Sequence, residues 1–353
     1  MKNLGVLIQQ PSPKEKKAGD GNEMSQLTEA QMKKKKENAA SKLKITVLQG
    51  LDLESKVALT LKRIREWYEH WDGDVYISWS KGKDSTILAY LVWSIYPDVP
   101  AIFSDTGLEY PEIKSYMPDF AIGREIVRVR PKKTFKQVIN EDGVALLSKK
   151  WAKAIRVLKE KSPKTEQVRK LHLTGINGSG NKSNGWKLPN KYHKLIDADI
   201  KISEKCCDHL KKAPFIQYEK DTGRKPFSGS LAAEGGNRKF STQKCNAFTT
   251  GRPISNPLLF WNEEDIWAFA EDKGIRFSEI YYERVNEAGE TLPPEQRTGC
   301  MFCMFGVQLE EGENRFQRMH KSHPRHWDTC INKLGLKHAL DLIDVKYIPS
   351  DKE

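Results

Sequence analysis

The sequence contains no run of eighteen apolar residues, which excludes a transmembrane helix of ordinary length. We expect no secretory signal peptide either, because the apolar stretch near the amino terminus, residues 4–8, is too short for its core. The expected location is therefore the cytoplasm. The composition, 38% hydrophobic and 30% charged over 353 residues, is that of a globular chain with about two folding units.

Acidic residues are the minority among the charged ones. The chain has 47 Asp and Glu against 59 Lys and Arg, a net charge of +12 at pH 7. Residues 1–45 hold ten lysines and five acidic residues, and we interpret them as a flexible basic arm. Residues 174–191 are rich in Gly, Asn and Lys and are predicted to form a mobile basic loop. This basic excess favours a polyanionic partner such as a nucleic acid or the phosphates of a nucleotide.

Short β-rich runs alternate with helical segments after residue 53, which is typical of βαβ units that build a parallel sheet. The first helix should bury Val57, Leu61, Ile64, Tyr68 and Trp71, which recur at intervals of three and four. The predicted strands are residues 75–79, 99–104, 125–130 and 228–233, and the predicted helices are residues 53–71, 84–96, 111–120 and 263–273. The chain is thus expected to divide into the arm (1–45), an α/β domain (46–250) and a helical C-terminal region (251–353).

The segment from Ser80 to Thr86, with the sequence SKGKDST, runs from a predicted strand through a Gly-containing turn into a predicted helix. This geometry places backbone N–H groups and a helix N-terminus against a phosphate, with serine, threonine and lysine side chains as further donors. The segment is not a Walker A loop, because that motif needs glycine where Ile77 stands. An ordinary strand-to-helix turn capped by serine is the alternative, and the combination of features favours phosphate binding.

Residues 80–85 resemble the PP-loop of the adenine nucleotide alpha-hydrolase-like proteins, usually Ser-Gly-Gly-Lys-Asp-Ser, with Lys81 in place of the first glycine. Residues 105–112, DTGLEYPE, resemble the strand-end motif of the phosphoadenosine phosphosulfate (PAPS) reductase family within that superfamily. The resemblance extends more loosely over residues 53–330. It implies an α/β fold with a doubly wound, mostly parallel sheet, in which both motifs meet at the carboxyl edge of the sheet.

The resemblance also implies a set of ligand contacts. Residues 148–150 resemble a Ser-Lys segment of the family that lies near the nucleotide. Residues 234–238 resemble a phosphate-binding segment, in which Arg238 would donate two parallel hydrogen bonds to a phosphate or sulfate. The expected nucleotide is ATP or PAPS, with Mg²⁺ as a further candidate. The candidates for catalysis are Asp84, Asp105 and Cys245. The expected nucleotide-binding residues are Ser80, Lys81, Gly82, Lys83, Asp84, Ser85, Thr86, Asp105, Thr106, Gly107, Lys149 and Arg238.

Cysteine is scarce, and four of the six cysteines form a pattern: Cys206 and Cys207 are adjacent, and Cys300 and Cys303 form a CxxC pair. In a reducing compartment such a set is more often metal-binding or catalytic than disulfide-bonded. Four thiolates suit either tetrahedral zinc or a [4Fe–4S] cluster, and the spacing alone does not choose. The pattern resembles that of the iron–sulfur adenylyl-sulfate reductases, which implies a [4Fe–4S] cluster held by these four residues.

The other two cysteines stand outside this pattern. Lys244 should lower the pKa of Cys245, which is a candidate for a ligand in place of Cys207, a sulfur-carrying nucleophile or an inert buried thiol. Cys330 is interpreted as a packed small hydrophobic residue. The reductases carry a nucleophilic cysteine in a Glu-Cys-Gly-x-His-like motif near the C-terminus, and no segment after Cys303 has that form.

These observations favour an enzyme that cleaves ATP to adenylate a substrate oxygen, which sulfur then displaces, with a nucleic acid or a small molecule as acceptor. The alternative is a PAPS or adenylyl-sulfate reductase that produces sulfite. A second alternative is a non-catalytic nucleic-acid-binding protein that contains zinc and a vestigial nucleotide fold. Either enzyme would need a sulfur or electron donor protein as its partner, and no membrane partner is expected.

Overall fold

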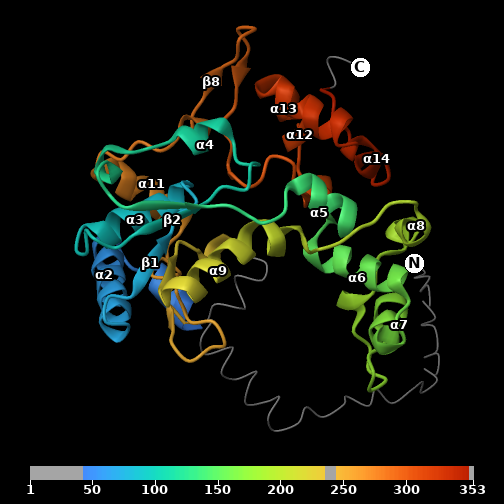
Figure 1. Cartoon of the computed structure of the whole chain (residues 1–353), viewed down its shortest axis with the longest axis horizontal. Coiled ribbons are helices and arrows are strands. Elements are labelled where there is room, and N and C mark those ends of the chain that lie inside the picture. Colours follow the sequence, from blue (N-terminus) through green and yellow to red (C-terminus); the bar gives the residue numbers. More distant parts are fainter. Residues whose placement is uncertain (1–42, 235–243, 350–353) are drawn as a thin grey trace, which may run out of the picture.

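A six-stranded sheet forms the centre of one half of the molecule (Figure 1). The computed structural model describes residues 43–234 and 244–349, so residues 1–42 of the predicted arm and Arg238 lie outside the described residues. The strands are parallel except for β6, which runs antiparallel to β7. Their order is β3 (Ile126–Val129), β2 (Ala101–Ser104), β1 (Val75–Ser78), β5 (Lys225–Ser228), β7 (Ile254–Ser255) and β6 (Asn246–Ala247). The predicted α/β class with a mostly parallel sheet is confirmed.

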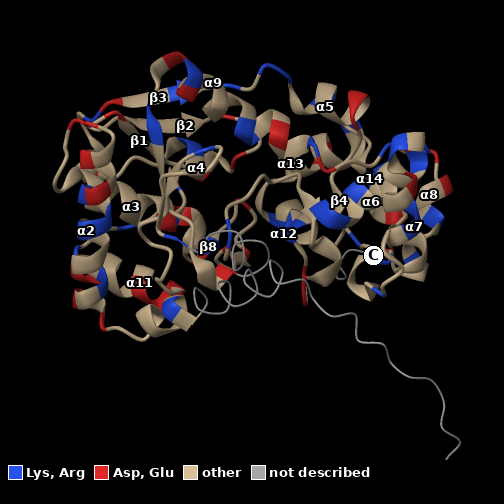
Figure 2. Ribbon diagram, turned by 90° about the horizontal axis from the view of Figure 1, so that it is seen from below, with Lys and Arg blue, Asp and Glu red and all other residues tan. Residues whose placement is uncertain are grey.

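Helices cover both faces of this sheet. On one face α3 (Lys83–Trp93) packs against β1 and β5 and is flanked by α2 (Leu53–His70) and α11 (Glu263–Asp272). On the other face α9 (Ala213–Thr222) contacts β2 and β3, as Figure 2 shows. Burial on both faces explains why β1 is a continuous apolar run. Among the residues the structure describes, no helix is both long enough and apolar enough to cross a membrane.

The first helix begins at the predicted residue, and its predicted face packs against the core: Ile64 is fully buried, and Val57, Leu61, Tyr68 and Trp71 are partly buried. Its other buried residues are Lys56, Thr60 and Trp67. Two polar contacts account for the burial of Lys56 and Thr60. The Lys56 ammonium forms an ion pair with Asp265 of α11 at 2.7 Å, and the Thr60 hydroxyl accepts a hydrogen bond from the Trp261 indole at 2.9 Å.

Two other predicted elements differ from the structure. The helix expected over residues 111–120 is divided into α4 (Pro111–Ser115) and a short 3₁₀ turn, Asp119–Ala121. The strand expected over residues 228–233 is wrong, because β5 occupies residues 225–228 and a 3₁₀ turn follows at Ala232–Glu234. Pro226 lies inside β5, and proline in a run argues against a central strand when only the sequence is read.

The rest of the described chain forms smaller elements beside the sheet. A two-stranded parallel pair joins β4 to β10, and β8 and β9 form an antiparallel hairpin. The described part of the predicted helical C-terminal region, residues 251–349, contains α11 and three shorter α-helices after it. These elements are α5 (Phe135–Glu141), β4 (Leu146–Leu147), α6 (Lys149–Glu160), α7 (Glu166–Thr174), α8 (Lys194–Asp197), β8 (Arg284–Val285), β9 (Thr291–Leu292), β10 (Met304–Phe305), α12 (Arg315–Ser322), α13 (Pro324–Asp328) and α14 (Leu336–Asp341).

Residues 149–201, which we name the basic insertion, leave the fold after β4 and return to it beside the same segment. The returning chain forms a backbone seam: the N–H of Val144 donates to the Lys201 carbonyl at 2.9 Å, and the N–H of Ser203 donates to the Val144 carbonyl at 3.0 Å. Gly143 starts this seam with a φ of 107°, and a Cβ atom there would lie 2.5 Å from the Lys201 carbonyl group. Only glycine fits such a backbone at this distance.

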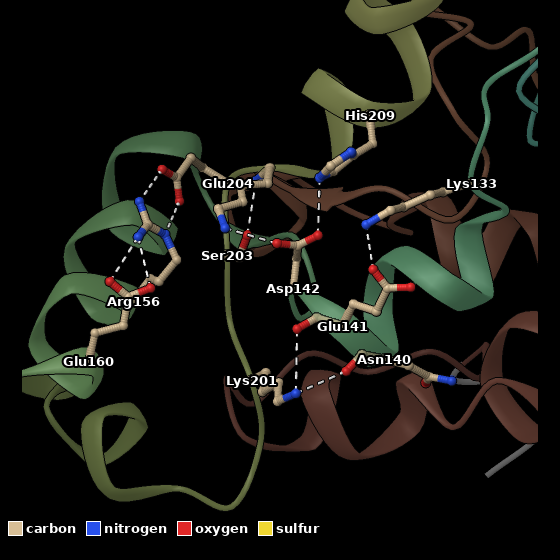
Figure 3. A network of polar contacts seen from close by, with 11 residues as sticks. Lys133, Asn140, Glu141, Asp142, Arg156, Glu160, Lys201, Ser203, Glu204 and His209 are labelled. Carbon is tan, nitrogen blue, oxygen red and sulfur yellow. Dashed lines mark hydrogen bonds and ion pairs between the residues drawn. The ribbon is translucent and has the colours of Figure 1, made fainter.

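Polar side chains reinforce the seam (Figure 3). Arg156 of α6 forms a forked pair of hydrogen bonds with the Glu204 carboxylate, at 2.7 and 3.0 Å. Asp142 accepts from Lys205 at 2.9 Å and lies 3.0 Å from the His209 imidazole. These contacts fix the segment that leads directly into Cys206 and Cys207.

Candidate functional site

The predicted phosphate loop lies at the carboxyl end of β1 and leads into α3. The N–H of Trp79 donates to the Ile102 carbonyl at 3.0 Å, which holds the start of the loop against β2. Helix α3 begins at Lys83 with Gly82 as the residue that precedes it. The loop therefore presents the N-terminus of a helix at the sheet edge where ligands bind in open α/β folds.

Lys81 occupies the position where the PP-loop usually has glycine, and its backbone is left-handed, with a φ of 60°. Its ammonium group donates to the Lys114 carbonyl at 2.9 Å and lies 5.1 Å from the centre of the Phe103 ring. Burial and the charge of Arg128 lower the pKa of Lys81. No carboxylate in the described part of the chain forms an ion pair with Lys81, so this buried cation is suited to an anionic ligand.

Hydroxyl groups surround Gly82. The Ser80 and Ser85 hydroxyls lie 3.0 Å apart, and the Tyr281 hydroxyl accepts a hydrogen bond from the N–H of Lys83 at 3.2 Å. Tyr281 in turn contacts the Thr298 hydroxyl at 2.5 Å. Because Thr298 lies two residues before Cys300, this contact connects the phosphate loop to the CxxC segment. Tyr281 belongs to no periodic pattern or motif, so its part in the site could not be predicted from the sequence.

Asp105 follows β2 and is buried among cations. Its carboxylate contacts the guanidinium of Arg128, lies 3.4 Å from Arg130 and 3.6 Å from Lys114, and accepts from the N–H of Gly107 at 3.2 Å. Burial raises the pKa of Asp105, but the hydrogen bond from Arg128 and the charge of Lys114 outweigh it, so the net shift is downward. The site therefore holds Asp105 as a carboxylate beside a surplus of positive charge.

The lowered pKa of Asp105 predicts a pH-dependent contribution to stability. The contribution is complete above the ordinary aspartate value of 3.8 and is lost as the pH falls through the lower pKa of the folded state. The free energy of unfolding of Asp105→Asn should therefore differ most from wild type near neutral pH, and the difference should shrink below pH 3.8. Denaturant titrations from pH 7 to pH 3 would measure it. A difference that stays constant over this range would contradict the assignment of the shift to Asp105.

The structure brings the four patterned cysteines into one neighbourhood. Burial raises the pKa of Cys206, and the charges of Cys207, Cys300 and Cys303 add to that effect. Lys211, on the π-helical turn Asp208–Lys212, has a raised pKa chiefly because of the charge of Cys300, with further contributions from Cys207 and Cys303. The N–H of Met301 donates to the Leu108 carbonyl at 2.8 Å, so the CxxC turn also lies against the Asp105 loop.

This group of thiols fits a soft metal centre in its chemistry. Thiols whose pKa is raised by burial become ligands when a cation displaces their protons, and Lys211 supplies a neighbouring positive charge. The geometry is not that of a closed site: within residues 43–234 and 244–349, no three or more His, Cys, Asp and Glu side chains are arranged as metal ligands. Lys211 belongs to no sequence motif, so its place beside the cysteines was not predicted.

The remaining cysteines lie elsewhere. Cys245 precedes β6, and burial raises its pKa in spite of the charges of Arg63 and Lys44, so the expectation that Lys244 favours the thiolate is wrong. Cys330 is completely buried in the core, and burial raises its pKa as well. Neither cysteine has the environment of an activated nucleophile.

The other predicted nucleotide-binding residues lie in different parts of the structure. Thr106 donates through its hydroxyl and its N–H to the Glu109 carboxylate, at 2.6 and 3.1 Å, beside Asp105. Lys149 is the first residue of α6 and is exposed. Lys150 is directed into the basic insertion, where it donates to the Gly185 carbonyl. Arg238 lies outside the described residues.

A mostly parallel sheet covered by helices, with a loop and a helix N-terminus at the carboxyl end of a central strand, is an architecture typical of nucleotide-binding α/β proteins. Within that class, the model of the phosphoadenosine phosphosulfate reductase domain matches residues 74–304. The chain belongs to this family, as the motifs around Ser80 and Asp105 indicated.

Two known proteins are similar to this chain. An uncharacterized protein of Methanocaldococcus jannaschii is 21% identical over 283 residues, which are 80% of this chain and 53% of that protein. The chain therefore spans about half the length of this curated relative. The crystal structure of PAPS reductase from Candida auris in a phosphate complex covers 72% of this chain and 91% of its own, with 11% identity and a TM-score of 0.35.

Proposed function

We propose that this protein is an enzyme that binds an adenine nucleotide at the loop of residues 80–86 and uses ATP to activate a substrate for sulfur transfer. The observation that carries the proposal is the physical link between the loop and the CxxC segment, through Tyr281 and Thr298. A site that joins a nucleotide loop to a group of thiols is suited to chemistry between an activated oxygen and sulfur.

The proposed reaction has two steps. A substrate oxygen attacks the α-phosphorus of ATP, the bond to the β-phosphate breaks, and pyrophosphate leaves with the displaced charge. A sulfide-level sulfur nucleophile from the donor then forms a bond to the substrate atom that carries the adenylated oxygen. The bond between that atom and the oxygen breaks, and AMP leaves with the oxygen. The loop N–H groups, Lys81 and Lys83 would stabilise the charge that develops on pyrophosphate, since such pre-placed donors act most strongly in a buried site. Mg²⁺ with the nucleotide would add to this stabilisation.

Cys206, Cys207, Cys300 and Cys303 would hold the [4Fe–4S] cluster of the proposed enzyme. When bound, such a cluster supplies a place to hold sulfur or to pass electrons. The chain itself supplies Lys211, whose positive charge would offset part of the negative charge of four thiolates. The donor protein for sulfur or electrons is part of the same proposal.

Membership of the PAPS reductase domain family supports the alternative, a reductase that forms sulfite from PAPS or adenylyl sulfate. That reaction needs a thiolate to attack the sulfonucleotide sulfur. The environments of Cys330 and Cys245 argue against either as this thiolate, because burial raises the pKa of both. We therefore rank ATP-dependent sulfur transfer first.

Replacement of Lys83 tests the nucleotide site. Its ammonium lies 3.4 Å from Asp84 and 3.3 Å from Glu263, at the start of α3. Lys83→Met should lower the release of pyrophosphate and AMP from ATP about 100-fold, the usual loss for one donor to a developing anion. The matched control is Lys62→Met on the exposed side of α2, which should keep wild-type activity.

The same assay with a panel of nucleotides ranks the two reactions. ATP cleavage that depends on an acceptor supports sulfur transfer. Sulfite release from PAPS or adenylyl sulfate, without ATP cleavage in the presence of any acceptor, would reverse the ranking. If Lys83→Met matched wild type with every nucleotide, the loop would not be the nucleotide site.

A further inference from the structure

Positive charge is concentrated in the basic insertion. Residues 149–201 contain fourteen Lys and Arg against four Asp and Glu, a net charge of +10 out of +12 for the whole chain. Residues 1–45 carry +5, so the remaining 255 residues carry −3. Figure 2 shows α6, α7 and α8 together at one end of the molecule, away from β1, β2 and β3. The charge is therefore a property of one surface region and not of the protein as a whole.

Most of these cations are available to a ligand. Arg156 and Lys194 form ion pairs, with Glu160 and Glu204 and with Asp344. The exposed lysines of the insertion that form no ion pair with any described residue are Lys149, Lys150, Lys153, Lys161, Lys164, Lys170, Lys182, Lys187, Lys191 and Lys201. Such a set of unpaired charges suits a partner with regularly spaced phosphates.

An exposed aromatic ring lies among these lysines. Trp186 is 50% exposed, although a tryptophan normally gains from burial. The ammonium of Lys150 lies 5.3 Å from the centre of the Trp186 ring and 4.0 Å from that of Trp151. The loop is held in place, since the His172 ring nitrogen lies 3.0 Å from the Trp186 carbonyl oxygen and the N–H of Leu188 donates to the His172 carbonyl at 2.8 Å. An exposed ring on a loop with a hydrogen-bonded backbone, beside cations, is an arrangement on which unpaired bases stack.

Both ends of the insertion lie at the thiol group. Helix α6 begins directly after β4, which pairs with β10, and β10 follows Cys303. The returning end forms the seam at Gly143 and Val144, and Cys206 follows shortly after Ser203 in the chain. A polymeric ligand bound along the insertion would therefore lie close to the cysteines at either end of the insertion.

We propose that the basic insertion binds single-stranded nucleic acid, with phosphates on its lysines and an unpaired base on Trp186. This inference deepens the proposed function, because it names the class of acceptor that would be brought to the thiol group. Binding itself needs neither ATP nor a cluster, so it can be measured apart from the reaction.

The test is fluorescence anisotropy of the full chain with a labelled single-stranded oligodeoxynucleotide of mixed sequence, about 16 nucleotides long, without ATP. Lys153→Glu, Lys164→Glu and Lys170→Glu together should raise the Kd about tenfold or more. They should also lower the slope of log K against log salt by about 2, as expected when three phosphate contacts to a single strand are lost. The control variant carries Lys62→Glu, Lys220→Glu and Lys337→Glu. These three lysines are exposed outside the insertion, so the control should bind the oligonucleotide as wild type does.

Trp186→Ala tests the stacking contact and should weaken binding about 5- to 100-fold, with Trp186→Tyr restoring most of it. Equal effects of the two triple variants would overturn the proposal, because the charge of the whole protein would then be responsible. Binding to phosphatidylserine vesicles but not to the oligonucleotide would overturn it too. The same holds if a duplex of the same sequence binds more tightly than the single strand and Trp186→Ala leaves that binding unchanged. Lys83→Met should bind the oligonucleotide as wild type, so a failure of the nucleotide site is distinguishable from a failure of the insertion.

Discussion

Gly143→Ala is expected to destabilise the protein by about 2 to 5 kcal/mol. The left-handed backbone alone costs a residue with a Cβ about 1 to 2 kcal/mol, and overpacking adds about 1 to 3 kcal/mol. The added atom would lie 2.5 Å from the carbonyl group of Lys201, which is backbone and cannot rotate away. The seam would open at the segment that leads to Cys206 and Cys207. Chemical denaturation of wild type and variant gives the free-energy difference.

Gly223→Ala is the matched control for this experiment. Gly223 has a φ of 78° at the end of α9, and a Cβ atom there would meet no other atom within 4 Å. Its cost should be only the backbone contribution of about 1 to 2 kcal/mol. If both variants lost the same stability, the contact between Gly143 and Lys201 would contribute nothing, and the seam would not be a tight one.

Loss of the metal is the second large effect we expect. Protein prepared without oxygen should be brown and contain about four irons per chain, the content of a [4Fe–4S] cluster. Cys300→Ser or Cys303→Ser should abolish the colour and most of the iron, because an alcohol is a much poorer ligand than a thiolate. An iron assay and the visible absorption spectrum measure both.

Cys330→Ser separates ligand loss from general damage. Cys330 is fully buried in the C-terminal core, so its replacement should lower stability and leave the iron content unchanged. A colourless wild-type protein with one zinc per chain would replace the iron–sulfur proposal by a structural zinc site. A brown protein whose iron survives Cys300→Ser would place the cluster elsewhere.

The alternation of strands and helices is enough to predict that the loop after β1 and the segment after β2 lie together. Parallel strands end at one edge of a sheet, so the segments after β1 and β2 had to meet there, and Lys81 does reach Phe103 and Lys114. The pairing of two cysteines with a distant CxxC needed the family resemblance. Cys206 and Cys300 are far apart in the sequence, and no local pattern brings them together.

Other features could not be predicted because they depend on contacts between distant segments. Lys56 of α2 is buried in an ion pair with Asp265, and an apolar count ignores charged residues. The hydroxyl contact of Tyr281 with the phosphate loop and the position of Lys211 near the cysteines arise from loops without periodicity. Gly143 is one of many glycines, and only the returning chain makes it irreplaceable.

The pairing of β4 with β10 also sets an order of events during protein synthesis. Leu146 cannot meet Met304 until the ribosome has made the chain between them, which takes on the order of 10 s at ordinary rates. By then β1 and β2, which are neighbours in the sequence, can already be paired. Cys206 and Cys207 leave the ribosome in this interval without Cys300 and Cys303. Assembly of the thiol group therefore follows that of the nucleotide loop in a newly made chain.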